Sequence, residues 1–457
     1  MPEQEKQQRM RKEPHKGTRA DKPARPYVGD VVAKPKSAPG KALIALGLAV
    51  LSILVGFVIG ISVYAVMNLS TWLTDLLWMD VGGALGIPVF PLIVCTLGGI
   101  IIGIWTWWSH DVVRPLEEVM AEFKKTGSFR TNGAIKPVVT FLLPLVFGGS
   151  VGFEAGLTGL ISSGCCWIRD QLKRAGLRAG AVADVTIAAS MAAIFRTPLA
   201  GIVAGAESAP GNPSRVLEEP NVRDYDLRRS AKVILYTAAA LGAMVGVQVF
   251  NAVFGTSGGM PRFEEITATG TQLLWAIPCI ALAYGMTLVF HGSRHLFTRV
   301  ANRLGDNTMG TIEKPIIAGV IMGAVACALP YVLFPGETQS EELMHTWTTW
   351  SALALLGTGV LKAAITPMCI RMGWVGGDLF PSIFAGVAAG YGLAALTGAD
   401  PMLMVTVTAA AFLGGVLRKP FVVLAILFLC FPADGILWMG ISAVIGATLP
   451  LPLSTNE

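Results

Sequence analysis

Apolar runs long enough to cross a lipid bilayer recur along this whole chain. A membrane-spanning α-helix needs about 20 mostly apolar residues, and we identify such runs at 42–68, 89–108, 136–168, 181–208, 231–254, 271–291, 314–335, 349–370, 375–397, 401–431 and 435–453. Of the 457 residues, 53% are hydrophobic and only 14% are charged, whereas a soluble domain carries about 25% charged residues. The pattern predicts an all-α polytopic membrane protein.

The first 41 residues have the opposite composition. They carry eleven Lys and Arg against five Asp and Glu, and they contain too few apolar residues for a core, so we expect a disordered basic tail. The positive-inside rule places this tail on the cytoplasmic side of the cell membrane, together with three basic segments that we expect to be loops, 169–180, 215–230 and 292–306. The tail lacks interleaved aromatic residues, and no nucleic-acid partner is expected. Residues 454–457 form a short C-terminal tail.

The sequence lacks the groupings that most enzymes need. Its seven Cys and five His show no metal-site spacing, and the cysteines are best interpreted as small packing residues. No nucleophile with a matching base is evident. We therefore expect no catalytic residues, no metal, no cofactor and no enzyme activity.

Two sequence patterns occur twice in the same order. "AAIFRTPLAGIV" (192–203) aligns with "GGVLRKPFVVLA" (414–425), and upstream "GGSV" (148–151) aligns with "GGDL" (376–379). Such repeats are typical of transporter and channel folds. The order predicts a first membrane repeat at 42–230, with cytoplasmic loops, and a second at 231–453 with inverted orientation.

Glycine-rich breaks interrupt an apolar run in each repeat, near 149–153 and 377–381. Irregular backbone at membrane depth is tolerated only where protein buries it or where it lines a cavity. A helix that begins there presents unpaired amides and the positive end of its dipole, and two such starts predict an anion site. The alternative is close helix packing through GxxxG spacings, which Gly148–Gly152 and Gly386–Gly390 both have.

The stretches "GGSVGFEAG", "FRTPLAG", "LLGTGVLKAAIT", "GGDLFPSIFAG" and "FLGGVLRKP" together resemble the CLC chloride channel and transporter family, from about residue 42 to 450. The resemblance implies a homodimer in the lipid bilayer, with two inverted halves of tilted, often broken helices and one pathway for chloride or another small anion per subunit. Eukaryotic members add cytosolic nucleotide-binding domains, so a prokaryotic type is expected. Lys362 stands where many members carry Lys.

The resemblance also implies which backbone segments bind the anion. They are Gly149, Ser150, Val151, Gly152 and Phe153 in the first repeat, and Gly377, Asp378, Leu379 and Phe380 in the second. Asp378 is most simply interpreted as a helix N-cap. The family's motif G-S-G-I-P-E supplies a serine hydroxyl to the anion, but Val112 stands at that position here.

The acidic residues depart from the family pattern. Val151 stands where the family carries its gating Glu, and Glu154 lies three residues later, about one helical turn away. Glu154 has three interpretations: a displaced gate, a structural carboxylate at a helix start, or a packing residue. The acid pair that follows P-L-A-G in exchangers reads Glu207-Ser208, so Glu207 is either part of a proton path or a solvated residue at a helix end. These losses favour channel-like conduction, and the alternative is a proton-coupled antiporter of chloride or fluoride.

Overall fold

The structure is a computed structural model that describes residues 38–109, 135–153, 182–195, 198, 201–202, 229–255, 261–268, 270–305, 307–428 and 430–451. The chain divides into two units, residues 1–46 and residues 47–457. The described part of the first unit is only the beginning of helix α2 (Ala38–Asp75). The fold described below is that of the second unit.

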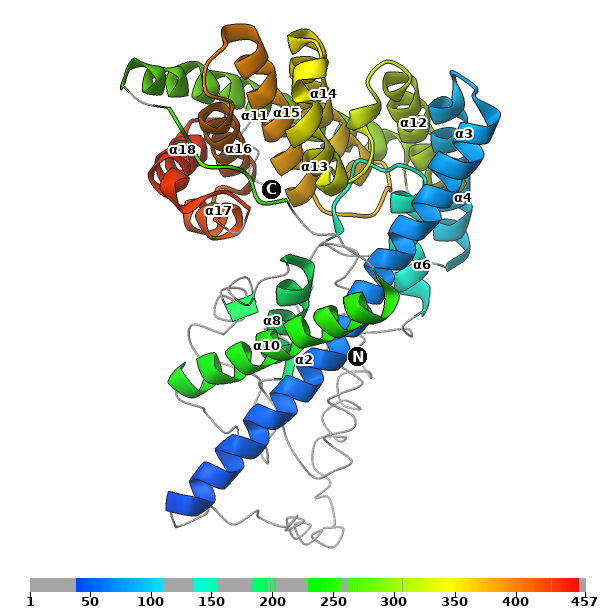
Figure 1. The fold of residues 1–457 in the computed structure, drawn as a ribbon. Helices are drawn as coiled ribbons and strands as arrows, with labels where there is room; N and C mark the ends of the chain where they lie inside the picture. The colour runs from blue at the N-terminus through cyan, green and yellow to red at the C-terminus, as the bar shows by residue number, and fades with distance from the viewer. Residues whose placement is uncertain are drawn as a thin grey trace, which may run out of the picture. The chain divides into compact units, whose positions relative to one another are not determined.

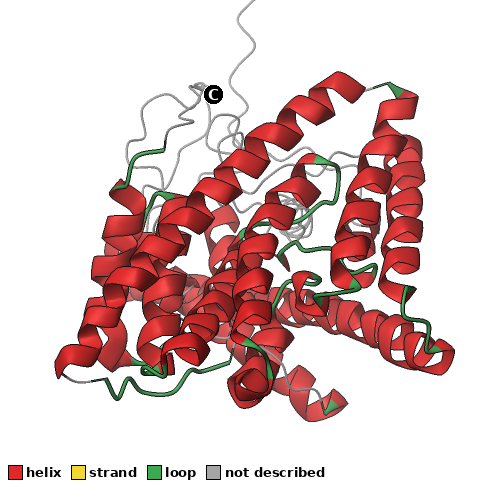
Figure 2. Cartoon of the chain, turned by 90° about the horizontal axis from the view of Figure 1, so that it is seen from above, coloured by secondary structure: helices red, strands yellow, loops and turns green. Residues whose placement is uncertain are grey.

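The described residues of this unit are helices joined by short loops (Figure 2). In chain order the larger helices of the described residues are α2, α4 (Phe90–Ser109), α6 (Ile135–Val146), α8 (Val182–Phe195), α10 (Arg229–Phe254), α11 (Ala276–Leu304), α12 (Thr308–Ala326), α13 (Glu337–Thr346), α14 (Ala352–Arg371), α15 (Leu379–Thr397), α16 (Pro401–Leu417), α17 (Pro420–Leu427) and α18 (Ile436–Thr448), labelled in Figure 1. Short helices complete them: η1 (Leu76–Val81), α3 (Gly82–Leu85), η2 (Gly270–Trp275), η3 (Pro330–Val332), η4 (Trp347–Thr349) and η5 (Ala433–Gly435).

Seven helical stretches in the described ranges are long and apolar enough to cross a membrane. They are Leu46–Leu85, Phe90–Ser109, Val233–Phe254, Leu273–Leu304, Thr308–Ala326, Ala352–Arg371 and Leu379–Thr397. Shorter apolar helices lie at Ile135–Val146, Pro401–Leu417 and Ala433–Thr448. The predicted all-α membrane class is confirmed.

Two boundaries differ from the sequence prediction. The basic segment 292–306 was expected to be a loop, but α11 continues through it to Leu304 and ends at Gly305, whose φ of +73° stops the helix. Hydropathy marks where apolar residues end, whereas a hydrogen-bonded helix can continue beyond that point until a residue such as glycine terminates it. The run 401–431 is broken instead, because Pro420 disfavours helical backbone at Lys419 and begins α17.

Helix α15 is almost entirely buried, packed between α14 and α16 (Figure 1). A Cβ atom at Gly386 or Gly390 would lie 2.5 Å from the Cα atom of Ala409 or Val405 on α16. Only glycine allows the two backbones to approach so closely. The helix-packing interpretation is therefore correct for Gly386–Gly390.

Helix α10 packs in the same way against the first repeat. It contacts α8, and a Cβ atom at Gly56 of α2 would lie 2.1 Å from the carbonyl oxygen of Ala239. Gly242 of α10 has the reciprocal relationship with the carbonyl of Ile53. Helix α10, which was predicted to begin the second repeat, thus packs on α2 and α8, which were predicted to belong to the first repeat. The predicted boundary between residues 230 and 231 stays a prediction.

Candidate anion site

The two glycine-rich breaks meet through their backbones. The Gly152 N–H donates to the Gly377 carbonyl at 2.7 Å, and the Gly377 N–H donates to the Gly152 carbonyl at 3.0 Å. This reciprocal pair is an isolated antiparallel bridge. Segments that lie more than two hundred positions apart in the sequence therefore form one local structure, which we call the 152–377 junction.

The junction leaves no room for a side chain at Gly376. A Cβ atom there would lie 2.4 Å from the Val151 Cβ atom, well inside van der Waals contact. Val151 itself is completely buried. Gly376, the first glycine of "GGDL", is thus required by a close approach of its backbone to the Val151 side chain.

Helix α15 begins beside the junction. In the second repeat α15 starts at Leu379, with Asp378 at the N-cap position. Asp378 precedes the helix as predicted, but its side chain does not form the capping hydrogen bond that the N-cap interpretation requires. In the first repeat the backbone becomes helical at Phe153, where the described segment ends. The positive dipole end of α15 consequently points towards the junction.

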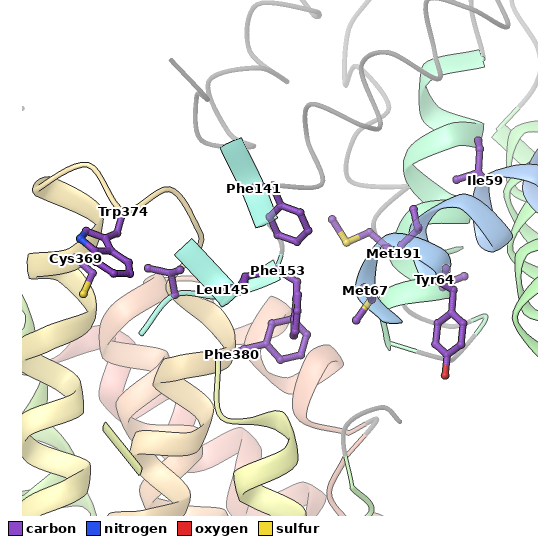
Figure 3. Close-up of a cluster of buried hydrophobic side chains, with 14 of the residues drawn as sticks. Ile59, Tyr64, Met67, Phe141, Leu145, Phe153, Met191, Cys369, Trp374 and Phe380 are labelled. Carbon is purple, nitrogen blue, oxygen red and sulfur yellow. The ribbon is translucent and has the colours of Figure 1, made fainter. Parts of the chain in front are cut away.

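Aromatic residues that follow the two junction glycines, Phe153 and Phe380, lie close together (Figure 3). The Phe153 ring contacts the Phe380 ring edge to face, with centroids 5.9 Å apart, and it contacts the Phe141 ring of α6 at 6.3 Å. Such edge-to-face pairs stabilise packing beyond the area that they bury. All three side chains are buried, so the rings place low-dielectric material next to the junction in sequence, and charges and dipoles interact strongly in such material.

The backbone before the junction is fixed by contacts from three helices. The Gly149 N–H donates to the Pro144 carbonyl at 2.7 Å, and the Ser150 hydroxyl is hydrogen-bonded to the Thr366 hydroxyl of α14 at 3.1 Å. The Trp78 indole N–H donates to the Val146 carbonyl at 2.9 Å. Together these bonds hold the backbone of residues 146–150 in one conformation, directly before the junction.

Lys362 of α14 is a buried ammonium close to this backbone. Its side chain has 0% exposure, and its Nζ atom donates to the carbonyls of residues 331–334. Lys362 was noted in the sequence only through the family resemblance. Its carbonyl partners could not be identified there, because backbone acceptors carry no sequence signal.

The structure brings together the nine residues predicted to bind an anion, Gly149–Phe153 and Gly377–Phe380. Glu154, Glu207 and Val112 lie outside the described residues, so the predicted gate and proton path stay predictions. Sequence reasoning missed Trp78, Phe141 and Thr366, which contact the site from distant helices. A tryptophan or threonine inside an apolar run gave no indication of these contacts.

Comparisons with known proteins place this geometry in a family. A family model described as "Voltage gated chloride channel" matches residues 112–450. Chloride channel protein CLC-f of Arabidopsis thaliana is 24% identical over 313 residues, which are 65% of this chain and 37% of that protein. YfeO of Escherichia coli, provisionally described as an ion-transport protein, is 24% identical over 361 residues, covering 77% of this chain and 79% of that one.

Solved structures share the fold. The crystal structure of a CLC-type fluoride/proton antiporter has a TM-score of 0.64 and 17% identity, covering 88% of this chain and 94% of that one. A slow cyanobacterial Cl⁻/H⁺ antiporter gives the same TM-score, identity and coverage. The family model covers most of the sequence, and the structural match covers most of the fold. The chain therefore belongs to the voltage gated chloride channel family.

Proposed function

We propose that this protein moves chloride or another small anion across the cell membrane, through a pathway at the 152–377 junction in each subunit of a homodimer. The observation that carries the proposal is the Gly152–Gly377 bridge, which joins the segment 149–153 to the backbone just before the start of α15 at Leu379. The positive dipole end of α15, which begins beside this bridge, favours an anion there without any basic side chain.

Channel-like conduction is the favoured mechanism. The position that carries the gating Glu in the family is occupied by Val151, which is buried and has no ionisable group. A hydrocarbon side chain can neither carry a proton nor compete with the anion as a carboxylate would. Chloride movement should then proceed with little or no accompanying proton movement.

Proton-coupled antiport of chloride or fluoride is the second candidate. It is favoured by the fold shared with two structures described as antiporters. It requires that Glu154 and Glu207 carry protons from positions shifted relative to the family pattern. Ionisable residues within membrane segments are functional in most known cases, which gives this alternative its physical basis.

The experiment that tests the proposal is transport by purified protein in liposomes. Chloride efflux and proton movement are recorded together, first with protein-free vesicles as the control. We expect chloride efflux that depends on the protein and does not drive protons uphill. Proton pumping at a fixed ratio to chloride would establish the antiporter, and the absence of anion flux would reject both mechanisms.

The orientation is proposed on charge alone. The basic tail 1–41 and the basic segments 169–180, 215–230 and 292–306 are assigned to the cytoplasmic side, so the N-terminus is cytoplasmic. Single cysteines introduced into 292–306 should react with membrane-impermeant reagents only after the cells are opened. Labelling of this segment in intact cells would reject the orientation.

A further inference from the structure

Lys362 makes an unusual set of contacts for a buried cation. Its Nζ atom lies 2.8 Å from the carbonyl oxygens of Leu333 and Phe334, and 3.2 and 3.3 Å from those of Val332 and Tyr331. It also lies 5.1 Å from the centre of the Phe384 ring. An ammonium removed from water must regain hydrogen bonds from the protein. We call Lys362 and the four carbonyls of 331–334 the lysine clamp.

The clamp acts on the end of η3 and on the two residues that follow it, which together form the loop 331–334. Phe334 has a φ of +62°, a left-handed conformation that residues with a Cβ atom rarely adopt and that persists only where surrounding contacts enforce it. Two contacts enforce it here. The Phe334 carbonyl accepts from Lys362, and the Phe334 N–H donates to the Gly148 carbonyl at 3.2 Å.

The same loop residue is packed against the backbone that leads to the junction. The Phe334 ring meets the Trp78 ring edge to face at 5.1 Å, and the Trp78 ring lies so close to Gly148 that a Cβ atom there would be 2.7 Å from it. Gly148 itself has a φ of +83°. The segment 149–153 begins with the residue after Gly148.

A second connection runs along α14. Thr366 follows Lys362 by four residues and therefore lies on the same helix face, and its hydroxyl is bonded to that of Ser150. Lys362 is thus linked to the segment 148–150 by the loop on one side and by a single helical turn on the other. A shift of the ammonium would be transmitted to both ends of this short segment.

We propose that Lys362 is a positioning residue that sets the anion preference of the 152–377 junction, through the loop 331–334 and the Gly148 backbone. This inference rests on the proposed anion transport. The ammonium holds Phe334 in its left-handed conformation, Phe334 holds the Gly148 carbonyl, and the amides of 149–153 are fixed as a result. Anion selection depends on the placement of those amides.

The test is transport by Lys362→Met in liposomes, because methionine keeps the apolar length of the side chain and removes the ammonium. We expect the chloride concentration for half-maximal flux to rise about tenfold, equivalent to about 1.4 kcal/mol, and the ratio of chloride to nitrate flux to change. Lys362→Arg, which retains a buried cation with donors, should recover part of both values. The matched control is Lys136→Met, since Lys136 contacts Ser109 and Trp108 instead of the loop.

Each outcome of this experiment either supports the inference or overturns it. The inference would be overturned if Lys362→Met folds and both its chloride concentration for half-maximal flux and its chloride-to-nitrate flux ratio equal those of the wild type. It would also be overturned if only the maximal flux fell and these two values did not change. If Lys362→Met does not fold, Trp78→Phe removes the bond to Val146 and retains a ring, and it should shift the flux ratio. An unchanged ratio in Trp78→Phe would then overturn the inference. Wild-type protein without chloride flux would instead reject the proposed function.

Discussion

Gly152 and Gly377 exchange both of their backbone hydrogen bonds. This pairing joins the segment that leads to Phe153 with the backbone just before the start of α15. Any change that separates the two glycines must displace the start of α15 relative to Phe153. Substitutions at the junction should therefore affect stability and transport together.

Gly376→Ala should destabilise the protein by about 1–3 kcal/mol, because the added methyl group overpacks Val151. Chloride flux per folded molecule should fall as well. The control is Gly285→Ala on α11, where nothing lies within 4 Å of the added Cβ atom and helix propensity should raise stability by about 0.5–1 kcal/mol. Thermal unfolding in detergent measures both changes, and a Gly376→Ala protein as stable as wild type would contradict the close contact.

The sequence was sufficient to predict the fold class and the two segments that meet. Apolar runs predicted most spans because a bilayer imposes a length on each helix. The repeated glycine pairs predicted the breaks because few residues allow such close backbone approach. The notable failure was the segment 292–306, where loss of apolar character was interpreted as loss of helix.

The surroundings of the junction could not be predicted in the same way. Trp78, Phe141 and Thr366 reach it from three different helices, and their contacts depend on tertiary packing. Lys362 was identifiable as a rare charge in an apolar run, but its four partners are main-chain carbonyls. Backbone acceptors are the same at every position, so no residue pattern could reveal them.

Val151→Glu should introduce pH dependence into anion flux. At neutral pH the new carboxylate would oppose the anion near the junction and slow chloride efflux. Acidification would neutralise it and restore flux, so flux should rise as pH falls. Val151→Gln is the control of equal shape, and its flux should not vary with pH in this way. Equal pH profiles for the two variants would show that residue 151 does not face the anion.

Glu154→Gln distinguishes a gate from a structural carboxylate. If Glu154 gates the pathway, the variant should conduct faster than wild type, lose the wild-type pH dependence and fold normally. If Glu154 stabilises a helix start, the variant should lose about 0.5–2 kcal/mol of stability and retain the wild-type pH dependence. We expect the first result, and chloride efflux measured across a pH series together with thermal unfolding decides between them.

Arg418 should stabilise the second repeat by joining two helix ends. Its Nη1 atom donates to the carbonyls of Ala447 and Leu449 at 2.6 and 2.7 Å, and its backbone caps α16 with a φ of +56°. Arg418→Ala should cost about 1–3 kcal/mol through the lost charged hydrogen bonds. Arg418→Gly should cost less, because glycine adopts this φ without strain. Equal stabilities of the two variants, measured by thermal unfolding, would show that the backbone conformation contributes nothing.

The location of the anion can be measured by diffraction from crystals grown in bromide, whose anomalous scattering identifies it unambiguously. If the pathway passes through the 152–377 junction, a bromide peak should lie within hydrogen-bond distance of backbone amides in 149–153 or 377–380. Crystals in chloride provide the matched control, in which that peak should be absent. Protein that transports chloride in liposomes, yet binds bromide only at places away from both segments, would contradict the junction as the anion site.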